Sequence, residues 1–428
     1  MPHMDYKTLA ISVFITAYIL FIFLPARRTA VAVMASLLII VSGAMTLKQT
    51  LFAINWNVMG IFAGTLIVAD IFMESRVPAW LAEVIVNRTK SASWAILLVC
   101  IFTGFISSFV ENVATVMIMA PIALAIAKKL NISPVKVIIG IAISSNLQGT
   151  ATMIGDSPSM LLAGFAKMDF WDFFFYKGKP SIFFAVELGA VFAFTVLYLF
   201  FRKHTQKHPA VSQEKVKSWI PTVFLVCMVL SLALASFLRF GFSWRAGAIC
   251  VSFGIVSILF NKLANGNSIR QTFKVFDWNT AFFLMSIFIL VGSLTVTGWV
   301  EIAAERLSKI IGSNIFFGYT LIVFVSVALS AFIDNIPFLA AMLPVTISLA
   351  NKLGVDPSLF LFGLLIGASL GGNITPIGAS ANVVGCGMLK KEGYHVKFSD
   401  FVKMGLPFTL AAVIAAYIFL WFVWGIRK

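Results

Sequence analysis

Two stretches of this sequence repeat each other and decide the fold: SSFVENVATVMIMAPIALAIAKKLNISP at 107–134 and SAFIDNIPFLAAMLPVTISLANKLGVDP at 330–357. The two copies align without a gap, and 9 of the 28 aligned positions are identical. Each copy holds a carboxylate followed by an asparagine inside an apolar stretch, first at Glu111 and then at Asp334. A charged residue at membrane depth costs about 2.5–3.5 kcal/mol, so a duplicated one indicates a functional site. Matching polar breaks in two halves are also typical of a secondary transporter.

The composition places the chain in a membrane. Hydrophobic residues make up 60% of the 428 residues, and charged residues only 11%. A soluble domain has about 25% charged residues, so this chain cannot cover itself with a normal solvated surface. Its apolar runs are continuous and approach the ~20 residues that a membrane-spanning helix needs. The sequence therefore predicts an all-α polytopic membrane protein.

The net charge of +15 does not indicate nucleic-acid binding. Basic residues lie mostly in short loops between apolar segments, as expected for loops on the cytoplasmic side. The most basic loop, RKHTQKHPAVSQEKVKS at 202–218, separates the two repeats, and we assign Arg27 and Arg28 to the same side. The four cysteines are scattered without a metal-ligand spacing, so we expect no metal site.

The chain divides into two halves with the same internal order. Each half contains a re-entrant hairpin followed by a broken helix. In addition to the two hairpins, we expect about ten transmembrane helices. One of them lies near 30–46. An odd number of crossings in each half makes the repeats inverted and places both termini outside. The expected boundaries are a first repeat at 1–201 with its hairpin near 95–130 and its broken helix near 148–158, a cytoplasmic linker at 202–219, and a second repeat at 220–428 with its hairpin near 314–352 and its broken helix near 371–382.

The predicted helix breaks follow the two hairpins at the same spacing, so they are repeat partners as well. They read GTATMIGDSPS from Gly149 and GNITPIGASAN from Gly372. Gly, Thr, Pro and Ser inside a membrane segment predict interrupted helices. The free backbone groups at such interruptions must face protein or a polar cavity. Half-helix ends offer N–H groups and carbonyls to ions and polar solutes. We therefore expect four broken elements to converge near the midplane.

These motifs resemble those of the ion transporter superfamily. FVENVATVMIMAP and FIDNIPFLAAMLP, with GTATMIGDSPS and GASLGGNITPIGASANVV, are most similar to the branch of the arsenical pump membrane protein and the P protein. Sodium/proton antiporters and dicarboxylate/sodium symporters are further relatives. The resemblance covers Trp56–Pro180 and Trp278–Pro407. It implies scaffold and transport domains, elevator-type motion and usually a homodimer.

Three carboxylates are candidates for proton coupling: Glu111, Asp334 and Asp156. Desolvation favours the neutral form of a carboxylate, which makes proton binding and release feasible. Asp156 has no counterpart, because the second break has Ala379 in its place. The alternative for each carboxylate is that it only caps the end of a broken helix.

Neutral polar residues at the hairpin tips and breaks are candidates for binding the solute or ion. They are Asn112, Thr150, Thr152, Ser157, Asn335, Asn373, Thr375, Ser380 and Asn382. Their alternative role is to pack helices together, which small polar residues commonly do inside membranes. We expect no catalytic residue and no cofactor, and thus no enzyme.

The carboxylates narrow the class of solute. In the dicarboxylate symporters each hairpin tip carries Ser-Asn-Thr, whereas here Glu111 and Asp334 replace the serines. Carboxylates repel a multiply charged anion, strongly so where the dielectric is low. They favour a cation, a proton or a neutral polyhydroxyl solute such as As(OH)3. We therefore predict proton-coupled efflux of trivalent arsenite or antimonite across the inner membrane.

Two other functions stay open on the same scaffold. One is a sodium/proton antiporter or a sodium-coupled anion symporter, and the other is a channel-like role. No Walker A motif is evident, so energy has to come from an ion gradient or from a separate ATPase subunit. The expected partners are membrane lipid, the small solute with its protons, and a second copy of the chain.

Overall fold

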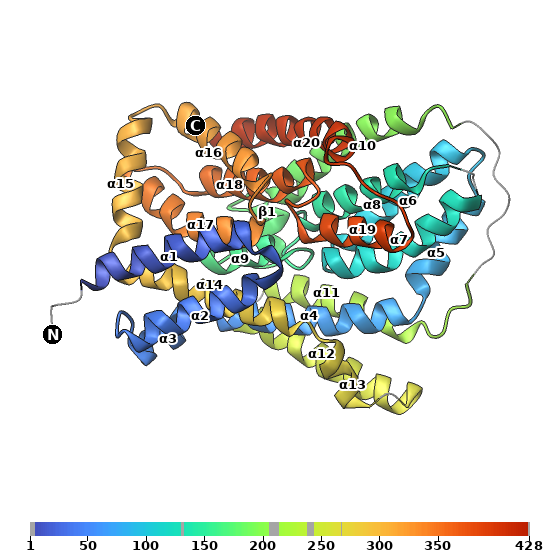
Figure 1. Cartoon of the computed structure of the whole chain (residues 1–428), viewed down its shortest axis with the longest axis horizontal. Coiled ribbons are helices and arrows are strands. Elements are labelled where there is room, and N and C mark those ends of the chain that lie inside the picture. The colour runs from blue at the N-terminus through green and yellow to red at the C-terminus, as the bar shows by residue number, and fades with distance from the viewer. Residues whose placement is uncertain (1–4, 130–131, 205–213, 238–243, 267, 427–428) are drawn as a thin grey trace.

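The computed structural model describes residues 5–129, 132–204, 214–237, 244–266 and 268–426 (Figure 1). Most of these residues are helical, and two short strands, β1 (Phe175–Tyr176) and β2 (Lys179–Pro180), pair as an antiparallel hairpin. Eight of the described helices are long and apolar enough to cross a membrane. The prediction of an all-α polytopic membrane protein is confirmed. Residues 205–213 of the expected linker lie outside the described residues.

The described part of the first half contains ten α-helices and two 3-10 turns. In chain order they are α1 (Tyr6–Phe23), η1 (Pro25–Arg27), α2 (Arg28–Val41), α3 (Leu47–Ala53), α4 (Trp56–Glu74), α5 (Val77–Asn87), α6 (Ala92–Ser107), α7 (Asn112–Lys129), α8 (Pro134–Gly149), α9 (Ser157–Ala166), η2 (Trp171–Phe173) and α10 (Ile182–Phe201).

The second half repeats this order. It contains α11 (Ile220–Phe237), α12 (Arg245–Asn265), α13 (Ile269–Val275), α14 (Trp278–Val296), α15 (Trp299–Ile311), α16 (Ile315–Ser330), α17 (Asn335–Lys352), α18 (Ser358–Gly371), η3 (Gly372–Ile374), α19 (Ser380–Lys391), α20 (Phe398–Leu420) and η4 (Trp421–Gly425). The helices α16 and α17 begin and end at the exact repeat partners of the residues that begin and end α6 and α7.

Local hydrogen bonds repeat as well. The indole N–H of Trp56 donates to the carbonyl of Leu51 at 3.0 Å, and that of Trp278 donates to Phe273 at 2.8 Å. The residue before each tryptophan caps the helix that follows, α4 in the first half and α14 in the second. The two halves therefore share backbone geometry as well as sequence.

One expected crossing is shorter than predicted. The helix at 30–46 is α2, whose 14 residues extend about 21 Å at 1.5 Å per residue. This length is less than the ~30 Å of hydrocarbon that a span must cross. The helix ends early because Gly43 adopts a φ of +78°, a left-handed conformation that favours glycine. At its other end, η1 turns the chain from α1 into α2.

The helices form two groups, visible in Figure 1. The first, which we call the frame, consists of α1, α2, α4, α11, α12 and α14; within it α4 packs along α12, and α14 packs along α2. Each of these pairs joins one repeat to the other. The second, which we call the hairpin group, consists of α6–α10 and α16–α20, and α10 and α20 pack along each other. Packing within each group is more extensive than packing between the groups.

Equivalent elements lie at opposite ends of the molecule. In Figure 1, α15 and both termini lie at the left, whereas α5 and the end of α10 lie at the right. The pair α6–α7 lies in the right half and α16–α17 in the left half, so their connecting tips come together near the centre. This arrangement supports the expectation that the two repeats are inverted.

Candidate functional site

The first hairpin tip lies between Ser107, the last residue of α6, and Asn112, the first of α7. Its carboxylate, Glu111, turns back onto the helix that follows. The Glu111 Oε2 atom accepts hydrogen bonds from the backbone N–H groups of Val113 at 2.8 Å and Ala114 at 3.2 Å. A carboxylate here satisfies N–H groups that have no partner within the helix.

The second tip has the same construction. Asp334 caps α17, and its Oδ1 atom accepts a hydrogen bond from the backbone N–H of Ile336 at 3.1 Å. The capping role considered for both carboxylates is therefore present in the structure. Glu111 caps its helix through one carboxylate oxygen. The second oxygen of Asp334 forms an ion pair with Arg28.

Each helix break packs on the neighbouring hairpin tip. The Thr152 hydroxyl donates to the carbonyl of Ser108, and the hydroxyl of its repeat partner Thr375 donates to the carbonyl of Ala331. A Cβ atom at Gly155 would lie 2.6 Å from the carbonyl oxygen of Gly149. Only glycine allows this approach, and Gly378 meets its own neighbours in the same way. The first repeat therefore joins tip and break into one unit, and the second does the same.

A chain of buried amides connects the two repeats. The amide of Asn112 donates to Asn146 Oδ1 at 3.3 Å, and the amide of Asn146 donates to Asn373 Oδ1 at 3.0 Å. The Asn373 amide in turn donates to the carbonyl of Ile143 at 3.2 Å. All three asparagines are buried. In this conformation Asn112 and Asn373 hold helices together, which is the alternative role weighed for them.

Asn146 was not among the predicted site residues. It lies in α8, in a stretch that reads AISSNLQG, and its partners come from both halves of the chain. The one signal in the sequence is a run of polar residues, Ser144, Ser145, Asn146 and Gln148, at the end of an apolar helix. Asn146 has no repeat counterpart, because the equivalent position is Ser369.

The other predicted ligands lie at the starts of half-helices or in the breaks. Asn382 donates to the carbonyls of Gly372 and Thr375, each at 2.9 Å, while its Oδ1 atom has no partner among the described residues. The Thr150 hydroxyl donates to the Asn146 carbonyl at 3.3 Å. Ser157 and Asn335 are buried at the starts of α9 and α17.

Asp156 differs from the other two carboxylates in having one buried oxygen without a partner among the described residues. It is 5% exposed, and its Oδ2 atom has no hydrogen-bond partner among the described residues. Asp156 lies close enough to Glu111 for the two charges to interact. Two neighbouring carboxylates repel each other when both are ionised, so a proton or a cation stabilises the pair. In the described part of the chain, no group of three or more His, Cys, Asp and Glu side chains could hold a metal ion.

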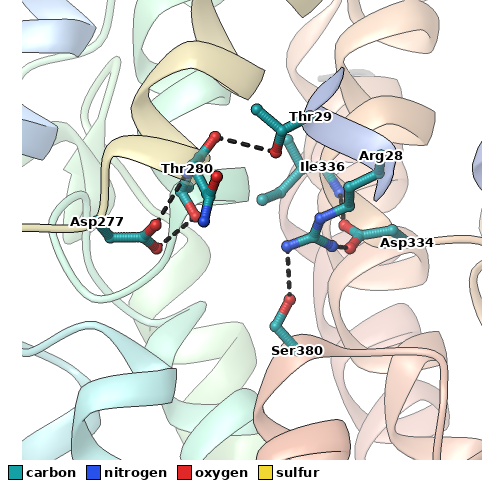
Figure 2. Close-up of polar contacts among 8 residues, drawn as sticks. Arg28, Thr29, Asp277, Thr280, Asp334, Ile336 and Ser380 are labelled. Carbon is teal, nitrogen blue, oxygen red and sulfur yellow. Dashed lines mark hydrogen bonds and ion pairs between the residues drawn. The ribbon is translucent and has the colours of Figure 1, made fainter. Parts of the chain in front are cut away.

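Arg28 is a member of this site that the sequence did not reveal. Its guanidinium pairs with Asp334 and donates to the Ser380 hydroxyl at 3.2 Å, as Figure 2 shows. The basic pair Arg27-Arg28 predicts a solvated cytoplasmic loop, whereas in the structure Arg28 contacts the second hairpin tip. Arg28 begins α2 and turns toward the second hairpin tip, whereas Arg27 is exposed. Nothing in the local sequence distinguishes the two arginines.

Fold and site together define a polytopic membrane transporter. Its two related halves each join a carboxylate-bearing hairpin tip to a helix break. The chain belongs to the CitMHS citrate transporter family, whose model matches residues 18–345 and 247–428.

Two curated relatives are similar to this chain, one over nearly the whole of its own length and the other over part of its own length. The chain is 27% identical over 430 residues to an uncharacterized transporter of Mycobacterium tuberculosis, covering 97% of this chain and 98% of the relative. It is 26% identical over 488 residues to the human P protein, covering 94% of this chain and 58% of that protein. The resemblance to the P protein is thus supported, and the arsenical pump side of the predicted branch stays a prediction.

Two solved transporters share the fold. The YdaH transporter of Alcanivorax borkumensis superposes with a TM-score of 0.62 at 13% identity, covering 98% of each chain. MtrF of Neisseria gonorrhoeae, described as one of a class of antimetabolite efflux pumps, superposes with a TM-score of 0.59 at 14% identity. It covers 99% of this chain and 95% of its own. These similarities concern the fold alone.

Proposed function

We propose that this transporter is a proton-coupled secondary carrier that exports a small neutral solute. The observation that carries the proposal is the pair formed by half-buried Glu111 and buried Asp156, whose charges interact, with Oδ2 of Asp156 unpartnered among the described residues. A single proton relieves their repulsion, so the occupancy of the pair depends on pH. Transport follows an elevator mechanism, in which the hairpin group carries the site past the frame.

The solute that we propose is arsenite or antimonite in its neutral trihydroxide form. Such a molecule donates three O–H groups and brings no charge into the site. Among the described residues, Asp156 Oδ2 and Asn382 Oδ1 are buried acceptors that lack donors. A buried acceptor without a donor is costly, and a hydroxyl-rich solute would satisfy it. The three carboxylates of the site oppose a multiply charged anion.

Arg28 favours a second candidate, a sodium-coupled anion symporter. A guanidinium binds a carboxylate in two parallel hydrogen bonds, and the family is described by citrate transport. An anionic substrate would have to displace Asp334 from Arg28 and would need cations to offset the remaining carboxylates. A sodium/proton antiporter is the related case in which the carboxylates bind cations only.

Flux into everted membrane vesicles or proteoliposomes distinguishes these candidates. We expect arsenite or antimonite uptake that does not depend on sodium and stops when the proton gradient is collapsed. In Glu111→Gln this uptake should fall about a hundredfold or more, the loss typical of removing one proton-transfer group. Asp70→Asn is the matched control, because Asp70 lies on α4 of the frame. Sodium-dependent anion flux without metalloid movement would establish the second candidate instead.

The proposal also includes the setting of the carrier. We place it in the inner membrane as a homodimer that draws its energy from the proton gradient. Chemical cross-linking in membranes would test the dimer. Flux in liposomes that contain this chain alone would show that no separate ATPase subunit is required.

A further inference from the structure

Arg28 joins the two helix groups. It begins α2, which belongs to the frame, whereas its partners Asp334 and Ser380 lie at the starts of α17 and α19 of the hairpin group. Asp334 is in turn fixed by its cap on Ile336, so the carboxylate has a defined position (Figure 2). The ion pair therefore stabilises the present position of the second hairpin relative to α2 and has to break if that position changes.

The frame holds the arginine in place from its own side. The guanidinium carbon lies 5.1 Å from the centre of the Phe283 ring, which is fully buried in α14. The neighbouring Thr29 hydroxyl donates to the carbonyl of Asn279 at 3.2 Å, which ties the start of α2 to α14. A cation held over an aromatic face is stabilised by the ring quadrupole. Arg28 is thus part of the frame and only touches the hairpin group.

Three carboxylates surround this guanidinium. Asp334 pairs with it directly, and Asp277 at the start of α14 and Glu111 at the first hairpin tip lie within range of its charge. Asp277 lies on the frame, so it stays with Arg28 whatever the hairpin group does. Figure 2 shows Asp277 on the side opposite to Asp334, bonded to Thr280. A guanidinium that leaves Asp334 therefore keeps a carboxylate nearby.

We propose that Arg28 is a tethered cation that occupies Asp334 in the empty carrier and so holds it in this conformation. A proton or a small monovalent cation that binds Asp334 takes the place of Arg28, and the hairpin group is then free to move. Moving without this exchange would leave a largely shielded carboxylate, 17% exposed, without its partner, which is unfavourable. Arg28 is thus a positioning residue that makes movement conditional on occupancy. The inference rests on the proposed movement of the hairpin group.

The first test measures the pair without any solute. Arg28→Gln, Arg28→Lys, Asp334→Asn and the double variant Arg28→Gln with Asp334→Asn are purified, and thermal unfolding is followed from pH 5 to 8. We expect Arg28→Gln to melt lower than wild type, the double variant to recover part of that loss, and Arg28→Lys to lie between. Arg27→Gln is the matched control, because it removes the same charge from an exposed neighbour. Additive effects in the double variant would overturn the pair.

The second test measures transport in proteoliposomes. Without the guanidinium, Asp334 should take up a proton more readily. The curve of transport rate against pH should therefore move, in Arg28→Gln, by about one pH unit or more toward alkaline pH. Arg27→Gln removes the same charge from an exposed neighbour and should leave the pH dependence of transport in place. An unchanged profile in Arg28→Gln, or a rise in KM for an anionic solute alone, would contradict the proposal and make Arg28 a substrate ligand. The melting test needs no solute, so it separates failure of the pair from failure of the proposed function.

Discussion

Each hairpin tip uses one carboxylate for two purposes at the scale of single residues. Glu111 and Asp334 both cap the half-helix that follows them, and both also lie in a cluster of charges. A cap bond uses one side of a carboxylate and leaves lone pairs for a proton or a cation. The same carboxylate can therefore cap a helix and take part in proton coupling, so the two roles considered for it do not exclude each other.

The close packing of break on tip predicts a large effect for Gly155→Ala. The added methyl group would lie 2.6 Å from the carbonyl oxygens of both Gly149 and Ser107, and backbone atoms cannot move aside cheaply. Overpacking of this kind costs about 1–3 kcal/mol. We expect a clear drop in melting temperature and in transport.

Gly387→Ala is the matched control for this substitution. It lies in α19, where an added Cβ meets nothing within 4 Å. Alanine in a helix interior is favoured over glycine by about 1 kcal/mol, so this variant should be neutral or slightly more stable. Equal melting temperatures for the two variants would contradict the packing described here.

Single residues were the hardest part to predict from the sequence. The tips and breaks were predictable because each occurs twice with the same spacing. Asn146 and Arg28 have no repeat counterpart. Asn146 contacts Asn373, which lies 227 residues away along the chain, and Arg28 contacts Ser380, which lies 352 residues away. No local pattern encodes such contacts, since they arise only when the two repeats fold against each other.

At the scale of elements, the crossing of α4 and α12 decides how the frame is built. Gly64 lies so close to α12 that an added Cβ would be 2.1 Å from the backbone carbon of Cys250. Small residues allow this approach, which is the usual way to pack helices inside a membrane. We therefore expect Gly64→Ala to separate the two helices and to lower the yield of folded protein.

The same crossing supplies a control on its other helix. An added Cβ at Gly254 would be 3.4 Å from the Gly64 Cα atom, an ordinary contact. Gly254→Ala should therefore fold and melt close to wild type. Size-exclusion profiles and melting curves in detergent compare the two variants, and a Gly64→Ala protein as stable as Gly254→Ala would show that the crossing is looser than the structure has it.

The loop before α18 predicts a pH-dependent stability. Burial alone would raise the pKa of Asp356, but hydrogen bonds from Lys177 at 2.5 Å and from the Ser358 N–H at 2.9 Å outweigh it and hold the pKa below its usual value. A carboxyl group whose pKa is lowered on folding stabilises the fold at any pH above its unfolded-state pKa. This stabilisation is lost as the pH falls through the lower pKa of the folded state.

The size of this effect is small, because both side chains of the pair are about half exposed. Such pairs contribute about 0.2–1 kcal/mol. Melting curves between pH 6 and pH 3 should show Asp356→Asn slightly less stable than wild type at pH 6, with the difference shrinking toward pH 3. Lys177→Ala should give a similar loss at pH 6. A difference that grows toward pH 3 would have the wrong sign.

At the scale of the whole molecule, the duplicated order of elements made the fold class predictable. Composition predicted a helical membrane protein, and the repeat predicted equivalent hairpins and breaks in both halves. The length of α2 was not predictable from hydropathy, because its apolar run continues past Val41 while Gly43 ends the helix. The division into a frame and a hairpin group follows from pairings between repeats, which an apolar sequence does not specify.

The inverted arrangement predicts which face each loop occupies. Single cysteines at Lys129 and at Lys352 should react with a membrane-impermeant thiol reagent from opposite sides, because these exposed residues end the equivalent helices α7 and α17. The expected pattern is labelling of Lys352→Cys in intact cells and of Lys129→Cys only in everted vesicles. Labelling of both from one side would contradict the inversion.

We propose above all that Glu111, Asp156 and Asp334 couple solute movement to protons. The most direct measurement is the pH change inside proteoliposomes, recorded with a trapped dye, when arsenite or antimonite is added to one side. We expect a solute-dependent proton flux that disappears in Glu111→Gln, Asp156→Asn and Asp334→Asn and persists in Asp70→Asn. Solute movement with no accompanying proton flux in the unmodified protein would contradict this proposal.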